Sequence, residues 1–148
     1  MPPGRDIRHA LREYSRSYLR RRPVGRGSVT KVLLVDDEVA IVDLFGEALR
    51  EEGYEVIVAL DGVAALELYV LHRPAIVITD LALPRMSGLD VIRRLRGEAG
   101  CRIIAISGSG SSYLDRAIEC GAAMAFAKPV DIRELIDGVR QLVGGLER

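Results

Sequence analysis

The chain has 148 residues, of which 49% are hydrophobic and 28% are charged. This length suits one globular domain, and the apolar content is high enough to form its core, which excludes a chain that is disordered throughout. No apolar run approaches the roughly 18 residues of a membrane-spanning helix, and the N-terminus lacks the apolar segment of a secretory signal, so we expect a cytoplasmic protein. Cys101 and Cys120 form no metal-binding or redox motif, and we expect both to be reduced thiols.

The net charge of zero conceals two oppositely charged regions. Residues 1–30 hold eight arginines and two acidic residues, a net charge of +6, and residues 31–148 have a net charge of −6. We therefore divide the chain into a basic N-terminal arm, 1–30, and an acidic globular domain, 31–148. Only Lys31 and Lys128 among the 21 basic residues are lysines. This rarity makes Lys128 a candidate functional residue, although its position alone does not exclude chance.

Predicted strands and helices alternate along the globular domain. The apolar run from Val32 to Val35 predicts a strand, and the apolar residues from Val39 to Leu49 recur at helical spacing. The continuously apolar segment from Ala75 to Thr79 is typical of a central strand covered on both faces. Further strands are predicted at 54–59, 102–106 and 123–127, and further helices at 62–73, 88–96, 113–120 and from Asp131 onward.

Five strands that alternate with five helices predict a doubly wound α/β domain with a five-stranded parallel sheet. Because crossovers are right-handed, few topologies remain, and the flavodoxin-like strand order 2-1-3-4-5 is the common one for a small domain. Ligands of such sheets bind at the carboxyl ends of the strands, beside the point where the strand order reverses. We therefore expect the functional site at that edge.

Polar residues follow the predicted strands at this edge. They are Asp36 and Asp37 after the first strand, Asp80 after the third, Ser107 after the fourth and Lys128 after the fifth. Each has a simpler explanation on its own, because an aspartate can cap a helix or form a turn, a serine can belong to a loop and a lysine can be solvated. Chance does not readily place all of them at one edge.

Three neighbouring carboxylates repel one another and raise each other's pKa unless a cation lies between them. A set of hard oxygen ligands that leaves room for water suits Mg²⁺. A carboxylate can also act as a nucleophile and form an acyl phosphate, whose phosphoryl oxygens a metal and an ammonium group would neutralise. The serine hydroxyl would donate a further hydrogen bond.

Four short motifs carry a family resemblance. They are Val-Leu-Leu-Val-Asp-Asp-Glu at 32–38, Asp-Leu-Ala-Leu-Pro-Arg-Met-Ser-Gly at 80–88, Ile-Ser-Gly at 106–108 and Lys-Pro at 128–129. Each motif is weak alone, but in combination they resemble the receiver domain of two-component response regulators, close to the single-domain chemotaxis and relay type. The resemblance covers about residues 31–146.

This resemblance implies a phosphoprotein of phosphorelay signal transduction. A histidine kinase or phosphotransfer protein would transfer a phosphoryl group from its phosphohistidine to Asp80. The implied Mg²⁺ ligands are Asp37 directly, Asp36 largely through water, Asp80, and the backbone carbonyl of Ala82. The receiver would help to catalyse its own phosphorylation and the later hydrolysis, but it would not otherwise be an enzyme.

The resemblance also implies a switch. Ser107 would contact the phosphoryl group and Lys128 would pair with it, and an aromatic residue three positions before the lysine usually follows the hydroxyl inward. Here that position holds Ala125, so the aromatic is missing. Phe126 lies one place later, on the opposite side of the strand, and we expect it in the core.

Further expectations concern turnover and output. Neither Ala82 nor Ser109, which occupy positions that tune dephosphorylation in the family, can orient water well, which implies slow autodephosphorylation. About 19 residues follow Pro129, so we expect no C-terminal output domain and an unknown downstream protein target.

Two other functions stay open. A phosphatase or mutase with an aspartyl-phosphate intermediate generally has an acid two residues after the nucleophile, where this chain has Ala82. A pseudo-receiver that serves only as a protein-interaction module is disfavoured by the intact set of acidic, hydroxyl and ammonium groups.

The basic arm contains a candidate amphipathic helix. Within residues 5–22, apolar side chains recur at helical spacing among arginines, at Ile7, Leu11, Tyr14 and Tyr18. An anionic membrane surface, a nucleic acid backbone or an acidic partner protein would each suit such a segment. The alternative is a non-essential tail, with the true start of the protein nearer Val29.

Overall fold

The computed structural model describes residues 29–146, so all of the basic arm except its last two residues lies outside the described part. The strands are β1 (Lys31–Val35), β2 (Glu55–Ala59), β3 (Ile76–Asp80), β4 (Arg102–Ser107) and β5 (Met124–Ala127). The helices are α2 (Val39–Glu51), α3 (Gly62–His72), α4 (Gly88–Leu95), α5 (Ser111–Cys120) and α6 (Ile132–Leu146). All pairings in the sheet are parallel and its order is β2-β1-β3-β4-β5, which confirms the predicted doubly wound α/β fold.

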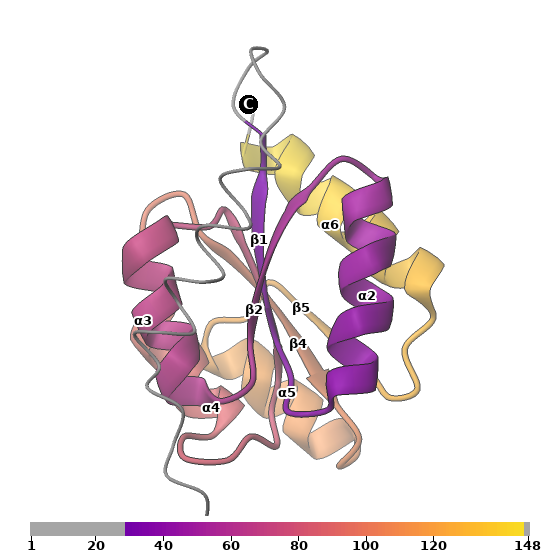
Figure 1. Cartoon of the computed structure of the whole chain (residues 1–148). Helices are drawn as coiled ribbons and strands as arrows, with labels where there is room; N and C mark the ends of the chain where they lie inside the picture. Colours follow the sequence, from indigo (N-terminus) through magenta and orange to yellow (C-terminus); the bar gives the residue numbers. More distant parts are fainter. Residues whose placement is uncertain (1–28, 147–148) are drawn as a thin grey trace, which may run out of the picture.

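The sheet separates two layers of helices (Figure 1). Helices α2 and α6 cover one face, and α3, α4 and α5 cover the other. Residues of odd and even number alternate between the faces, so that Leu33 packs with the α3 side and Leu34 with the α2 side. Both central strands are buried except for the first residue of β1, as expected for parallel strands covered on two sides.

Two strands end later than the sequence predicts. Asp80 is the last residue of β3 and pairs with Ile106, and Ser107 is the last residue of β4 and pairs with Ala127. Polar side chains at these positions do not interrupt the backbone ladder, because the ladder depends on amide and carbonyl groups and not on side chains. The candidate site therefore begins inside the sheet.

The loop between β3 and α4 is pressed closely against its surroundings. A Cβ atom at Gly88 would lie 2.1 Å from the carbonyl oxygen of Asp80, and one at Gly62 would lie 2.5 Å from that of Met86. Arg85 in this loop forms an ion pair of 3.7 Å with Asp61, the N-cap residue of α3. The two glycines therefore permit a backbone approach that a larger residue would prevent.

Strand β5 places its two middle residues on opposite faces. Ala125 packs against the cluster beneath α3, α4 and α5, whereas Phe126 packs against the cluster beneath α2 and α6. Phe126 thus lies on the predicted side of the strand, where it is partly buried against the core. Cys101 and Cys120 are free thiols, as predicted. Among the described helices, none has the length and apolarity that crossing a bilayer requires.

Candidate functional site

The carboxyl edge of the sheet brings the predicted polar residues together. Asp36 follows β1, Asp80 and Ser107 end β3 and β4, and Lys128 follows β5. Carboxylate oxygens of Asp36, Asp37 and Asp80 lie within 4.8 Å of one another. Strands β1 and β3 are direct neighbours although about 40 residues separate them in the chain. The topology therefore makes a cluster from residues that are distant in sequence.

Asp36 is held in a fixed position. Its side chain is almost fully buried, one carboxylate oxygen accepts a hydrogen bond of 2.9 Å from the amide of Glu38, and its own amide donates to the carbonyl of Ala59. Burial raises the pKa of Asp36, and the amide of Glu38 and the ammonium of Lys128 oppose this rise. Asp37, by contrast, is exposed to solvent.

Asp80 is buried to 5% exposure at the end of β3. Its Oδ1 atom accepts a hydrogen bond of 3.1 Å from the amide of Ala82. The neighbouring hydroxyl of Thr79 donates to the carbonyl of Asp80 over 2.9 Å. One carboxylate oxygen is therefore oriented by the loop, while the other faces Lys128.

Lys128 joins two of the carboxylates. Its Nζ atom lies 2.8 Å from Oδ2 of Asp80 and 3.2 Å from Oδ2 of Asp36. Burial lowers the pKa of this ammonium group, but the hydrogen bonds and charges of the two carboxylates outweigh the burial and raise the pKa above its ordinary value. The lysine therefore stays charged at neutral pH and links β5 to both central strands.

Ser107 is 2% exposed and lies at the same edge. Its hydroxyl oxygen accepts a hydrogen bond of 3.1 Å from the amide of Ser109. The hydroxyl group of Ser107 can therefore donate its own hydrogen to another acceptor. Ala82 and Ser109 are both exposed, and neither side chain carries a carboxylate or an amide.

The donor set fits a divalent cation. Three carboxylates and one ammonium give a formal charge of −2 in this cluster. Oxygen ligands without nitrogen or sulfur, one of them exposed, suit a hard ion that keeps part of its hydration, such as Mg²⁺. Asp36, Asp37 and Asp80 are the side chains that would hold it.

Sequence reasoning missed several residues that support this cluster. Thr79 is the last residue of the run before Asp80, and its hydroxyl was the available signal. The close approach of Gly88 to Asp80 and the pair between Arg85 and Asp61 carried no comparable signal. They depend on how two loops meet, and local sequence patterns do not encode such contacts.

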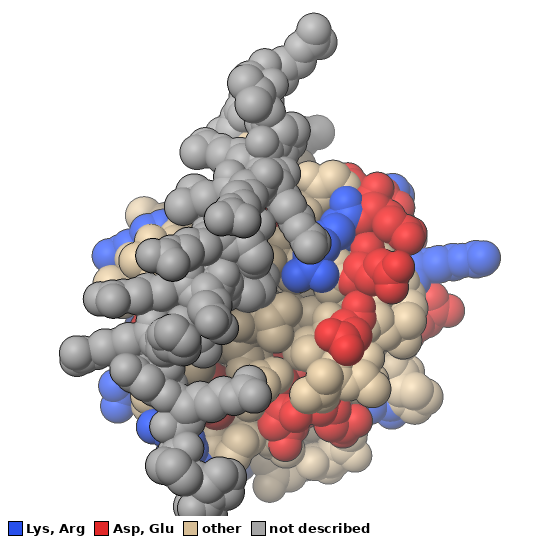
Figure 2. All heavy atoms as spheres, viewed as in Figure 1, with Lys and Arg blue, Asp and Glu red and all other residues tan. Residues whose placement is uncertain are grey.

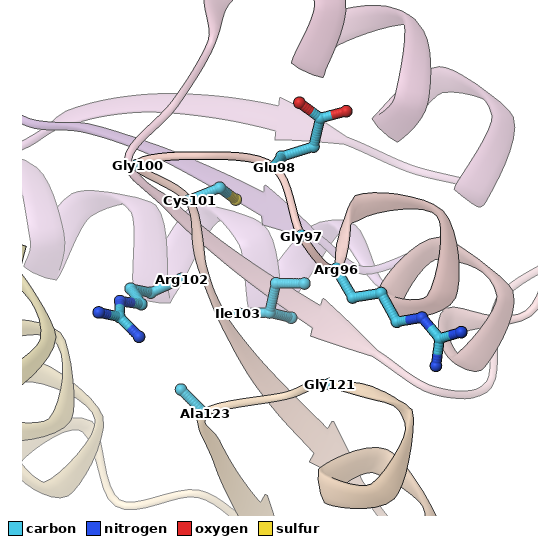
Figure 3. A pocket seen from close by; sticks show the side chains of 9 residues that line it. All are labelled: Arg96, Gly97, Glu98, Gly100, Cys101, Arg102, Ile103, Gly121 and Ala123. Atoms are coloured by element: carbon cyan, nitrogen blue, oxygen red, sulfur yellow. The ribbon is translucent and has the colours of Figure 1, made fainter.

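A cavity at the opposite edge of the sheet does not form a comparable cluster. It has a volume of about 350 Å³ and lies where α4 and α5 end and β4 begins. Figure 3 shows that the guanidinium groups of Arg96 and Arg102 point away from each other on its two sides. Charged groups therefore line this cavity without converging on a ligand position.

Comparisons with known proteins agree with the geometry. The pattern of the response regulator receiver domain matches residues 32–140. Sporulation initiation phosphotransferase F of Bacillus subtilis is 34% identical over 113 residues, which cover 75% of this chain and 91% of that protein. Sensory transduction protein RegX3 of Mycobacterium tuberculosis is 38% identical over 117 residues, which cover 78% of this chain but only 51% of the relative.

Solved structures show the same fold. A CheY-like response regulator receiver domain protein from Methanospirillum hungatei superposes with a TM-score of 0.77 at 27% identity, covering 81% of this chain and 98% of that one. A putative response regulator from Chloroflexus aurantiacus gives a TM-score of 0.74 at 29% identity, covering 82% and 100%.

Proposed function

The chain belongs to the response regulator receiver domain family, and from this membership we propose that Asp80 accepts a phosphoryl group from the phosphohistidine of a histidine kinase or phosphotransfer protein. The bridge that Lys128 forms between Asp80 and Asp36 is the observation that best supports this function. It sets a permanent positive charge beside the proposed nucleophile. The name of the Bacillus relative, a phosphotransferase, is consistent with a role in a phosphorelay.

The proposed reaction exchanges one bond to phosphorus for another. A carboxylate oxygen of Asp80 attacks the phosphorus atom, the bond between phosphorus and the histidine nitrogen breaks, and an aspartyl phosphate forms. The ammonium of Lys128 and the hydroxyl of Ser107 would then bind phosphoryl oxygens. Bound Mg²⁺ would supply further positive charge for those oxygens.

The residues of the chain have separate roles in this proposal. Asp36, with Asp37, carries the charge that attracts the cation, and the amide of Ala82 orients Oδ1 of Asp80. The backbone carbonyl of Ala82 is proposed as a further metal ligand. Hydrolysis of the aspartyl phosphate is expected to be slow, because neither Ala82 nor Ser109 has a carboxylate or amide group suited to orienting a water molecule.

We infer that the phosphorylated form signals by binding another protein. The globular domain, residues 31–148, would carry this activity, and the arm, residues 1–30, would be separate from the phosphorylation chemistry. Because Ala125 replaces the aromatic residue of the usual switch, the response would depend on Ser107 and the loop that follows it. The alternative, an interaction module that is never phosphorylated, makes the opposite prediction in the experiment below.

The test is the intact mass of the full chain after incubation with Mg²⁺ and acetyl phosphate. We expect one phosphoryl adduct that requires Mg²⁺, is lost in base and is absent from Asp80→Asn. Asp90→Asn is the matched control, since Asp90 is an exposed aspartate on α4 and should leave the adduct unchanged. An adduct that persists in Asp80→Asn, or no adduct with acetyl phosphate and with phosphorylated kinases, contradicts the proposal.

A further inference from the structure

Helix α3 is apolar on the face that points away from the sheet. Its inner face packs through Ala65, Leu68 and Tyr69. At the helical spacing of the outer face lie Val63, Glu67, Val70 and Leu71, whereas Leu66 is half-buried and packs against the inner cluster. Val70 and Leu71 are 66% and 58% exposed, the highest values among the exposed large hydrophobic residues of the described chain. A helix that is apolar all round is usually covered on both sides.

The neighbouring helix α4 shows what a solvated face looks like in this protein. Its exposed positions are Asp90, Arg93 and Arg94, and Asp90 pairs with Arg93 over 3.0 Å. The outer face of α3 has only one charged residue, Glu67, among three apolar ones. We call these four residues, Val63, Glu67, Val70 and Leu71, the α3 stripe.

The chain enters the globular domain at one end of the α3 stripe. The ammonium of Lys31, the first residue of β1, lies 3.4 Å from the carbonyl oxygen of His72, the last residue of α3. The carbonyl of Lys31 accepts a hydrogen bond of 3.0 Å from the amide of Ala75, just beyond that helix. The first residue of β1 therefore lies beside the C-terminal end of α3, the end that carries Val70 and Leu71.

The preceding segment has an apolar pattern of matching length. Ile7, Leu11, Tyr14 and Tyr18 repeat at helical spacing, and a helix from the first to the last of them would be about 18 Å long. The 11 residues of α3 span about 16 Å. Residues 23–28, which follow the segment 5–22, could extend over roughly 20 Å, which is enough chain to turn back along α3.

The charges are complementary as well. The arm carries a net charge of +6 and the globular domain −6. Glu67 lies within the α3 stripe, and half-buried Glu55 on edge strand β2 points to the same side of the sheet as Ile57. Between residues 29 and 146, no basic side chain forms an ion pair with either glutamate. Burial raises the pKa of Glu55, and an arginine partner would oppose that rise.

Acidic side chains also gather on the other side of the β2 edge, over α2, as Figure 2 shows. Asp43, Glu47 and Glu51 are exposed on that helix. They add to the negative potential that an arginine-rich segment near β2 would experience. The outer face of α2 mixes these acids with apolar residues, so it lacks the continuous apolar surface of α3.

We propose that residues 5–22 of this chain dock on the α3 stripe as an amphipathic helix, with Ile7, Leu11, Tyr14 and Tyr18 against its apolar residues and arginines beside Glu55 and Glu67. Because the arm and the α3 stripe belong to one chain, the contact is intramolecular, and the effective concentration of the arm is in the millimolar range or above. This favours the arm of the same chain over a second copy or a separate partner. The docking requires neither phosphorylation nor Mg²⁺.

The test measures how fast a thiol on the stripe is alkylated in the full chain. Val70→Cys is compared with Ile118→Cys, since Ile118 is 47% exposed on α5 and distant in the fold from α3. Native Cys120 is buried, and burial raises the pKa of Cys101 to about 11, so both native thiols react slowly at pH 7. Leu71→Cys serves as a second reporter, in case one replacement disturbs the contact.

We expect N-ethylmaleimide to modify the thiol introduced by Val70→Cys about tenfold more slowly than that of Ile118→Cys. Adding Leu11→Asp should restore fast modification at position 70 and leave position 118 unchanged. The proposal is overturned if Leu11→Asp leaves the modification rate unchanged both in Val70→Cys and in Leu71→Cys. Protection that grows with protein concentration, or that appears only with anionic vesicles or nucleic acid, also overturns it, because another occupant then covers the stripe.

Discussion

The two edges of the sheet differ in how they arrange their charged groups. At the carboxyl edge, three carboxylates and one ammonium converge within a few ångströms. At the amino edge, Arg96 and Arg102 line a cavity but point in opposite directions (Figure 3), and Glu98 pairs instead with Arg73 on its exposed side. The difference shows that charged residues near a cavity indicate a binding site only when their side chains converge on one position.

A physical reason underlies this contrast. At the carboxyl edge the charged residues end strands or follow them directly, so the sheet fixes where their backbones lie. At the amino edge Arg96 and Glu98 lie just beyond the end of α4 and Arg102 begins β4, and the side chains of both arginines are exposed to solvent. The effects of substitutions at the carboxyl edge should therefore be coupled, whereas the effects of substitutions at the amino edge should be additive.

Gly88→Ala should have the largest effect. The new Cβ atom would lie 2.1 Å from the carbonyl oxygen of Asp80, so the loop or the end of β3 must move. We expect a loss of about 3 kcal/mol or more in the free energy of unfolding, together with loss of phosphorylation. Urea denaturation followed by circular dichroism measures the first quantity.

The matched control is Gly145→Ala, also in a helix but with no atom within 4 Å of the new Cβ. It should stabilise the chain by roughly 0.5 kcal/mol or leave it unchanged, because alanine favours the helix. Equal stability of the two variants would show that the close contact at Gly88 has no energetic importance.

Lys128→Ala should have the next largest effect. It leaves the buried carboxylates of Asp36 and Asp80 without their shared counter-charge, and we expect a loss of about 1–3 kcal/mol at pH 7. The loss should shrink as the pH falls from about 7 toward 4. Burial holds the pKa of Asp36 above its unfolded value, so the folded variant takes up protons more readily than the unfolded chain.

Thermal denaturation of Lys128→Ala and the wild type at several pH values measures this dependence. Lys31→Ala provides a comparison at the amino edge, where the ammonium contacts a single carbonyl oxygen. A deficit for Lys128→Ala that is the same at pH 4.5 and pH 7 would contradict the role of the lysine as a counter-charge.

His72 offers a smaller effect at the amino edge. Burial, together with the charge of Lys31, lowers the pKa of His72. The folded protein therefore binds fewer protons here than the unfolded chain, and stability should fall as the pH drops below about 6.5. In His72→Gln this part of the acid dependence should disappear, which melting curves between pH 5 and pH 8 would detect. An unchanged slope would show that His72 does not contribute.

Arg96→Ala and Arg102→Ala should have the smallest effects. Neither guanidinium forms an ion pair with a carboxylate in the described part of the chain, so each change should alter stability by less than about 0.5 kcal/mol. The effects should also add in the double variant. Strong coupling between Arg96→Ala and Arg102→Ala, or a loss of phosphorylation in either variant, would contradict the difference that we infer between the two edges.

Much of the fold was predictable because its signals are local. Apolar runs, helical spacing and breaking residues such as Pro74 located the strands and helices, and the handedness of crossovers then restricted the strand order. The members of the candidate site were also predictable, because the ends of parallel strands meet at one edge. The difference in burial between adjacent residues such as Asp36 and Asp37 was not predictable, since it depends on the side to which each residue points.

Contacts between loops were the other part that the sequence did not reveal. The bridge from Lys128 to both Asp36 and Asp80 requires the position of a side chain relative to two other strands. The pair between Arg85 and Asp61 likewise depends on how the loop before α4 meets the start of α3. These details follow from tertiary packing and leave no periodic pattern.

The sheet divides the apolar interior into two clusters that share no residue. Ile92 of α4 and Leu135 of α6 are both fully or almost fully buried, on opposite faces of the sheet. Each cluster therefore makes its own contribution to the free energy of unfolding, and the backbone layer of the sheet lies between the two clusters. A double-mutant cycle of Ile92→Val and Leu135→Ala should therefore give a coupling energy near zero, within about 0.5 kcal/mol.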